Sequence, residues 1–398
     1  MLALLAVSAR AFLPGLGERA FARQVSERVG RDRLGELPDG LHVMFCGTGS
    51  PLPDPTRAQA CVAVIAGERI FVVDSGSGSV ANLLLSGLPT GAIEAAFLTH
   101  FHSDHVSDLG DLGLQRWIGR AAEAPLPVYG PPGVEGVVDG FNAAYALDST
   151  YRTGHHGAAI APPAGRGLAA SVFEPGDGTA PVTVYQDDGL AVRAVRVDHA
   201  PADPAVAYRF DHAGRSLVIS GDLHAGRSPG FAVLSEGADV LIVEALEPRM
   251  VAPITQAASD RGLASLATIT VDILDYHTTP AGAAEAATAS GTRALVLTHV
   301  VPPVPSRLME PAFLREARAR FDGPVRLARD NLSQGRVRAL LVNSGNANAG
   351  TGRAGDADAR ACCEAAARAL DVSPEQVLPF STGVIGQALP VARMQQTI

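Results

Sequence analysis

Three histidines and one aspartate lie in a seven-residue segment that runs from Thr99 to His105, directly after an apolar strand-like run. His100 and His102 are two positions apart, so an extended chain points both imidazoles to one side. Asp104 and His105 follow at the turn into the next helix, where they can face a second position nearby. Imidazoles combined with a carboxylate suit a divalent cation of borderline hardness, zinc above others. The segment therefore predicts a metal site at the end of a strand, which needs a sheet to support it.

Three further metal-ligand candidates each follow an apolar strand, namely His199, Asp222 and His299. Because a sheet presents the residues at its strand ends along one edge, these side chains can meet the first segment in space. A single histidine of this kind is more often an ordinary core or surface residue. Seven candidates in one pattern favour a metal site instead. Its ligands must be imidazoles and carboxylates, because the chain contains no Cys-x-x-Cys pair.

Short apolar runs alternate with helix-compatible segments through residues 41–330, which predicts an α/β fold of two sheets with helices outside. The predicted strands cover residues 41–46, 62–66, 70–73, 95–98, 182–185, 190–197, 206–210, 216–219, 240–243 and 294–297. The predicted helices cover residues 79–85, 108–118, 280–289 and 311–321. Residues 152–179 are rich in Gly, Ala and Pro, and are predicted as a long or partly disordered loop near the site.

Length and charge limit the organisation and the partners of the chain. Its 398 residues exceed one ordinary domain, and its formal charge of −9 argues against a protein that mainly grips nucleic acid phosphates. A run of about 18 apolar residues is absent, so no membrane span is predicted. Residues 1–40 are predicted as an N-terminal helical segment, with the remnant of an anchor as the alternative. The compartment stays open, the cytoplasm being favoured over an anchored or exported location.

The pattern resembles the metallo-β-lactamase fold, an αββα sandwich, and specifically its branch of ribonuclease Z, phosphodiesterases and arylsulfatases. The resemblance spans about residues 41–330. Besides the metal-ligand candidates, it rests on the motifs Gly47-Thr48-Gly49-Ser50 with Pro53 and Arg57, Gly130-Pro131-Pro132-Gly133, and Tyr276-His277-Thr278-Thr279-Pro280. It implies two zinc ions, with manganese or iron as alternatives. One ion would be held by His100, His102 and His199, the other by Asp104, His105 and His299, and both by Asp222.

The resemblance also implies how such a site would work. Two metal ions acidify a shared water and neutralise charge on a phosphoryl, sulfuryl or carbonyl oxygen. His277 would protonate the leaving group, Glu244 would orient that histidine, and Asp104 would serve catalysis as well as metal binding. A helix-capping role for His277 and a strand-end salt bridge for Glu244 are the alternatives. The chain departs from ribonuclease Z at Val243, where the family has His, and at Leu223, where it has Thr.

The substrate predicted for this site is a small ester, a phosphodiester or an aryl sulfate, and a homodimer is considered. Processing of tRNA 3′ ends, as in ribonuclease Z, is the alternative. Two observations set it second. The family's tRNA-binding arm lies between the third histidine ligand and the bridging aspartate, and here only 23 positions separate His199 from Asp222. The acidic balance of the chain also makes nucleic acid an unlikely partner.

Residues 335–393 resemble a second family, the bifunctional ornithine acetyltransferase/N-acetylglutamate synthase of arginine biosynthesis. The resemblance rests on two blocks in the right order, residues 340–350 and 378–386. Thr382 and Gly383 would form an oxyanion hole. The family's nucleophilic Thr lies further downstream and has no counterpart before Ile398, so glutamate acetyltransferase activity is not expected. The predicted organisation is residues 1–40, a hydrolase domain over 41–332, and an incomplete α/β fragment over 333–398, with a partner-binding tail as the alternative.

Overall fold

The computed structural model describes residues 17–19, 21–23, 25–26, 29–30, 32–330, 339–346, 352–370, 377–384 and 390–397. The chain divides into two compact units, residues 1–330 and 331–398. Residues 1–16 of the predicted N-terminal helical segment lie outside the described part, while residues 17–19, 21–23 and 25–26 are helical. Among the described residues, no helix combines the length and the apolar character needed to cross a bilayer.

The first sheet of the front unit has six strands in the order β1-β2-β3-β4-β5-β6. The first three strands pair antiparallel and the remaining neighbours pair parallel. Gly67 makes the β2–β3 hairpin turn with a φ of 60°, a conformation that favours glycine. The strands are β1 Leu41–Gly47, β2 Cys61–Ala66, β3 Arg69–Val73, β4 Ile93–Phe97, β5 Leu126–Gly130 and β6 Leu168–Val172.

The second sheet has seven strands in the order β13-β12-β11-β10-β9-β8-β7. Strands β7 to β10 form an antiparallel meander, and β10 to β13 run parallel. The alternating sequence of the meander fits strands with one face on a core, whereas the apolar runs of β11 and β12 fit strands covered on both faces. The strands are β7 Val182–Asp187, β8 Leu190–Val197, β9 Ala205–His212, β10 Arg215–Ile219, β11 Val240–Leu246, β12 Ala294–Val301 and β13 Val325–Leu327.

Aromatic side chains fill the space between the two sheets. Phe71 and Phe97 of the first sheet share one buried cluster with Tyr208 and Phe210 of the second, and the rings of Phe97 and Phe210 lie 5.6 Å apart. Burial of this much apolar surface, at about 25 cal/mol per Å², holds the sheets face to face. The two apolar inner faces stack against each other. This stacking places strand ends from the two sheets along one rim.

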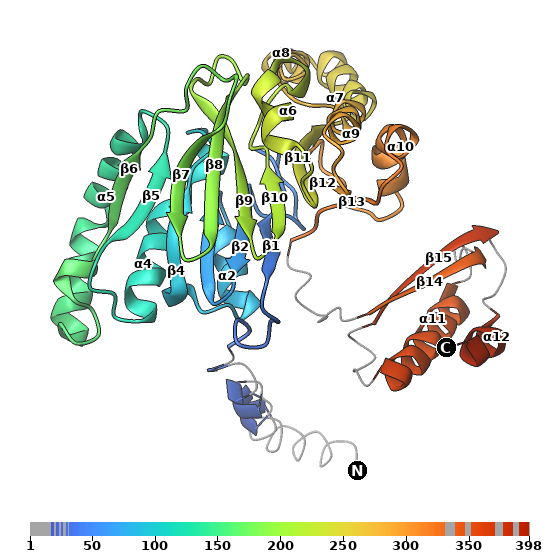
Figure 1. The fold of residues 1–398 in the computed structure, drawn as a ribbon, viewed down its shortest axis with the longest axis horizontal. Coiled ribbons are helices and arrows are strands. Elements are labelled where there is room, and N and C mark those ends of the chain that lie inside the picture. Colours follow the sequence, from blue (N-terminus) through green and yellow to red (C-terminus); the bar gives the residue numbers. More distant parts are fainter. Residues whose placement is uncertain are drawn as a thin grey trace, which may run out of the picture. The chain divides into compact units, whose positions relative to one another are not determined.

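Helices cover the outer faces of both sheets, as Figure 1 shows. One outer core packs the first sheet against α2 Ser79–Ser86, α3 Ser103–Val106, α4 Leu109–Gly119 and α5 Val134–His156. The other packs the second sheet against α6 Pro229–Ser235, α9 Pro280–Ala289 and α10 Glu310–Arg320. The unit also contains α7 Pro248–Asp260, α8 Ala264–Asp272, and the short 3₁₀ turns η1 Thr90–Ala92, η2 Pro163–Gly165 and η3 Ala225–Arg227. The predicted αββα sandwich is therefore confirmed.

The prediction of a long loop over residues 152–179 is wrong. Helix α5 continues to His156, and β6 occupies residues Leu168–Val172 within this segment. Strand β6 is the edge strand beside β5, and only Leu168 of its five residues is buried. Its small side chains give no apolar pattern, so the backbone pairing with β5 makes this segment a strand where side-chain periodicity does not.

A disulfide joins Cys46, near the end of β1, to Cys61, the first residue of β2. Both cysteines are buried, and their Cα atoms lie 5.0 Å apart. The bond closes the segment 47–60, which includes the Gly47–Ser50 motif.

The described residues of the second unit form two parallel strands, β14 Ala339–Asn346 and β15 Val377–Val384, and two helices, α11 Gly352–Leu370 and α12 Val391–Thr397. A parallel pair requires a crossover, and α11 lies between the two strands in the sequence. Helix α11 buries Cys362, whose sulfur lies 3.7 Å from the sulfur of Met394 in α12. This is the partial α/β fragment that the sequence predicts.

Candidate metal centre

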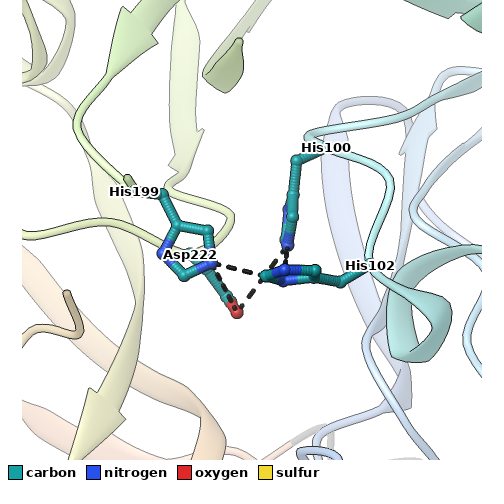
Figure 2. Close-up of side chains that lie close together, drawn as sticks. All are labelled: His100, His102, His199 and Asp222. Carbon is teal, nitrogen blue, oxygen red and sulfur yellow. Dashed lines mark hydrogen bonds and ion pairs between the residues drawn. The ribbon is translucent and has the colours of Figure 1, made fainter. Parts of the chain in front are cut away.

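Three predicted histidines converge beyond the ends of β4 and β8. Nε2 of His100 lies 2.9 Å from Nδ1 of His102, and Nε2 of His199 lies 3.4 Å from that same nitrogen. Oδ2 of Asp222, in the loop after β10, lies 3.8 Å from Nε2 of His199 and 4.0 Å from Nε2 of His100. Figure 2 shows these four side chains reaching one space from loops on opposite sides. Their ligand atoms lie within 4.8 Å of one another, so they could hold one metal ion.

A second group of potential ligands lies on the other side of Asp222. Nε2 of His299 lies 3.0 Å from Oδ2 of Asp104, and Nε2 of His105 lies 3.6 Å from that oxygen. Oδ2 of Asp222 is 3.4 Å from both of these imidazole nitrogens. One carboxylate oxygen therefore faces both groups, the arrangement needed to bridge two cations. All seven sequence-predicted ligand candidates are brought together.

The buried polar atoms of this centre fit a cation. Of the seven side chains, only His102 is exposed. Nε2 of His105 and Oδ1 of Asp222 are buried and make no hydrogen bond to any described residue. An unpaired buried polar atom is costly, whereas a nitrogen or oxygen lone pair aimed at a cation is satisfied. The donor set of imidazoles and carboxylates is the one that zinc and its neighbours accept.

The histidines of the first group have lowered pKa values, which suits metal binding. Burial, together with the neighbouring imidazoles, lowers the pKa of His100 well below its usual value. Burial also lowers the pKa of His102 and of His199, in spite of the opposing carboxylate of Asp222. These rings are thus neutral at pH 7, and a neutral ring offers the lone pair that a metal requires.

In the second group, the histidines have raised pKa values and so favour the protonated, positively charged form in the absence of a cation. Burial alone would lower the pKa of His105 and of His299, but the carboxylates of Asp222, Asp74 and Asp104 outweigh it and raise both pKa values. Burial would raise the pKa of Asp222, but the rings of His299 and His105 hold that pKa well below its usual value. Positive charge is thus favoured between these groups, and metal binding would release the protons.

Asp74, which the sequence analysis missed, orients this second group. It follows β3 with a φ of 60° and is buried. Its Oδ2 accepts a hydrogen bond from Nδ1 of His105 at 2.8 Å, which leaves Nε2 of that ring to face Asp222. Its two oxygens also accept from the backbone N–H and hydroxyl of Thr99, at 2.9 and 2.8 Å. The available signal was a carboxylate placed directly after a buried strand.

His277 and Glu244 lie together beside the two groups. Nδ1 of His277 donates to Oε1 of Glu244 at 2.9 Å, and the backbone N–H of Thr278 donates to the same oxygen at 3.0 Å. The ring of His277 lies 5.2 Å from the ring of His199 and 5.8 Å from that of His299. Burial disfavours the charged ring, but the Glu244 carboxylate outweighs this and raises the pKa of His277 to about 9. The ring therefore keeps its proton at neutral pH.

The two departures from the ribonuclease Z motifs place apolar side chains in the core. Val243 and Leu223 are both fully buried in the cluster behind the second sheet. The backbone N–H of Leu223 lies 3.3 Å from Oε1 of Glu244 as a hydrogen-bond donor. The Glu244 carboxylate is thus held by His277 and by main-chain groups, without the side chains that the family has at these two positions.

The Gly47–Ser50 motif bonds to the backbone next to His299. The carbonyl of Thr48 accepts from the backbone N–H of Val300 at 2.9 Å, next to His299 with its φ of 44°. The Thr48 hydroxyl donates to Oδ1 of Asp330 at 2.6 Å, and Arg57 donates to that hydroxyl at 2.5 Å. The Gly47–Ser50 motif therefore holds the backbone beside a potential metal ligand.

Thr382 and Gly383 lie in β15, opposite Ser344 and Gly345 of β14. Their role as an oxyanion hole stays a prediction.

An αββα sandwich with two such ligand groups at its rim defines a metallo-β-lactamase-fold hydrolase, and residues 69–300 match the family model described as the beta-lactamase superfamily domain. A ribonuclease Z of Mycolicibacterium paratuberculosis is 36% identical over 264 residues, which cover 66% of this chain and 86% of that protein. A ribonuclease Z of Mycolicibacterium gilvum is 34% identical over 292 residues, or 73% and 94%. The chain belongs to the ribonuclease Z family of this superfamily.

Solved structures agree on the fold. The metallo-β-lactamase fold protein YhfI of Bacillus subtilis has a TM-score of 0.51 at 20% identity, covering 73% of this chain and 98% of that one. The short form of human tRNase Z has a TM-score of 0.50 at 24% identity, covering 72% and 96%. Residues 317–398 match the ArgJ family model, so the predicted fusion with an arginine-biosynthesis fragment is confirmed.

The prediction that nucleic acid is an unlikely partner is wrong. The curated relatives that share 34–36% identity over most of their length are named as ribonucleases. The error came from the net charge and from the short span between His199 and Asp222. Net charge sums the whole chain, whereas a phosphate meets the local field of the site, where bound cations would be the largest charges.

Proposed function

We propose that the front unit hydrolyses a phosphodiester bond in RNA, with two divalent cations bound at the candidate metal centre. The observation that carries this proposal is the 34–36% identity to proteins named ribonuclease Z over 86–94% of their length. The shared carboxylate of Asp222 between two ligand groups supports it. Small phosphodiesters and aryl sulfates, which the sequence favoured, need the same centre and serve as comparison substrates.

Zinc is the cation we propose, with manganese or iron as alternatives. His100, His102 and His199 would hold one ion, Asp104, His105 and His299 the other, and Asp222 both. When bound, such a pair lowers the pKa of water and neutralises charge on a phosphoryl group. Asp104 would have a second role, because its oxygen faces His299 and His105 at once and so sets the spacing of these rings.

His277 would donate the proton that the leaving ribose oxygen needs. Its Nδ1 is held by Glu244, which leaves Nε2 to face the substrate. Its pKa of about 9 keeps the donor protonated at neutral pH. Glu244 would orient the ring, and the main-chain N–H groups of Leu223 and Thr278 fix that carboxylate in turn.

A precursor tRNA with a labelled 3′ trailer is the first substrate to test, with bis(4-nitrophenyl) phosphate and 4-nitrophenyl sulfate beside it. We expect the zinc-loaded protein to cut the RNA, and Asp222→Ala to abolish cleavage together with the binding of two zinc equivalents. Cleavage that persists in Asp222→Ala would remove the bridging role. His277→Ala should lower turnover while zinc content stays the same. If the loaded wild-type protein cuts small esters and no RNA, the small-ester function replaces the proposed one.

A further inference from the structure

The segment that carries His277 joins α8 to α9 and is not itself part of a strand. It is anchored partly on β11, where the N–H of Leu246 donates to the carbonyl of Thr278 at 2.8 Å and Oε1 of Glu244 accepts from the N–H of Thr278, and partly on two loops. The Thr278 hydroxyl donates to the carbonyl of Leu223 at 2.6 Å and accepts from the N–H of Ala225 at 2.9 Å. The carbonyl of Tyr276 lies 3.2 Å from Nδ1 of His199. The position of His277 therefore depends on the loop that follows Asp222 and on the loop that carries His199, as well as on β11.

Arg227, in the turn η3 after Asp222, contacts the loop that carries His199 and the segment that carries His277. Its Nε lies 3.2 Å from Oδ2 of Asp198, the residue directly before His199. Its Nη2 donates a hydrogen bond to the backbone carbonyl of Asp275, two residues before His277. One planar guanidinium thus joins the segment with a potential metal ligand to the segment with the proposed proton donor.

Other hydrogen bonds hold Arg227 and Asp198 in place besides the ion pair between them. The N–H of Arg227 bonds to the carbonyl of His224 at 2.9 Å, which closes the turn that points the side chain. The N–H of Asp198 bonds to the hydroxyl of Ser228 at 2.9 Å, and its carbonyl accepts from the N–H of His224 at 2.7 Å. Because Arg227 and Asp198 are held on a shared framework, the bond to Asp275 ties the start of the 275–278 segment to that framework, while Glu244 and Leu246 hold its end.

We infer that Arg227 is a positioning residue for leaving-group protonation, acting by holding the 275–278 segment against the His199 loop. This inference rests on the proposed function. The side chain of Arg227 is 46% exposed, and ion pairs this exposed contribute little to folding. Its removal should therefore leave the fold and the metal ligands in place and misplace the ring of His277. Misplacement of a reacting group by about 1 Å costs up to about 100-fold in rate.

The test compares two substrates that differ in the proton they need. A ribose oxygen leaves poorly without a proton, whereas a nitrophenolate leaves without one. For Arg227→Ala we expect kcat on precursor tRNA to fall about tenfold with KM nearly unchanged, and kcat on bis(4-nitrophenyl) phosphate to change less than about twofold. Zinc content should equal that of the wild type. Arg227→Lys should lie between, because one ammonium replaces one of the two contacts.

Arg196→Ala is the matched control. Arg196 is 41% exposed, pairs with Asp203, and lines the same 280 Å³ cavity as Arg227, but does not touch the 275–278 segment. We expect it to leave both activities unchanged. Equal losses on both substrates, a loss of zinc, or unchanged RNA cleavage in Arg227→Ala would overturn the inference. A wild-type protein that cuts neither substrate would instead overturn the proposed function, so the two failures are distinguishable.

Discussion

Asp74 and His105 lie 31 positions apart in the chain and are joined by a hydrogen bond of 2.8 Å from Nδ1 to Oδ2. The bond fixes the ring of His105 so that its other nitrogen faces Asp222, 3.4 Å away. The geometry of the second ligand group thus depends on a residue that would not itself touch a metal.

Asp74→Ala is expected to weaken metal binding at the second group. Loss of a partner that orients a ligating histidine costs about 10- to 100-fold in metal affinity. Metal analysis after dialysis should show zinc falling from about two equivalents toward one. Asp111→Ala, which removes a half-buried carboxylate of α4 that bonds to Gln115, serves as the control and should retain both. Two retained equivalents in Asp74→Ala would show that the ring is oriented by other contacts.

Gly221→Ala should displace Asp222, the proposed bridging ligand, by a steric clash in addition to backbone strain. Gly221 has a φ of 59°, and an added Cβ would lie 2.6 Å from Cβ of Thr99, which Asp74 holds in place. Gly214→Ala is the control, because Gly214 has a φ of 70° with open space around it. Both changes should cost about 1–3 kcal/mol of unfolding free energy through strain. Only Gly221→Ala should also lower zinc affinity, as a competition titration with a chelator would measure.

Asp330→Ala is expected to loosen the Gly47–Ser50 motif, which bonds to the backbone next to His299. The carboxylate accepts from the Thr48 hydroxyl, from the N–H of Ala58 and from the side chain of Asn82. Each buried donor left without a partner costs about 1–3 kcal/mol. Chemical denaturation should show a loss of several kcal/mol, and hydrogen exchange should rise in residues 47–60. Protection that stays at the wild-type level would mean that the disulfide and the other contacts of this segment hold it without Asp330.

His277 should make the stability of the metal-free protein depend on pH. Its folded-state pKa of about 9 lies above the unfolded value of about 6.5. A raised folded pKa means that this contribution is complete below about pH 6.5 and is lost as the pH rises through 9. The unfolding free energy of wild type minus that of His277→Gln, measured after chelation, should therefore shrink between pH 6.5 and 9. A difference independent of pH would contradict the raised pKa.

The regular part of the fold was readable from local order. Strand β8 and helix α9 have the bounds that apolar periodicity and the Thr279-Pro280 start signal predict. Strand β6 was missed because its small, mostly exposed side chains carry no period, and its edge position beside β5 is a non-local fact. Nucleic acid was wrongly set aside as a partner for a related reason, since a whole-chain charge says nothing about the field within one rim.

The identity of the potential ligands followed from the chain itself, because strand ends followed by His or Asp are recognisable wherever they occur. Which atoms share a cation did not follow. His299 meets Asp104 across 195 positions, and Asp74 reaches His105 from another strand. These pairings depend on how two sheets stack and where their ends coincide, and burial of the aromatic layer between them sets that alignment. Chemistry is written residue by residue, whereas distances between remote residues arise from packing.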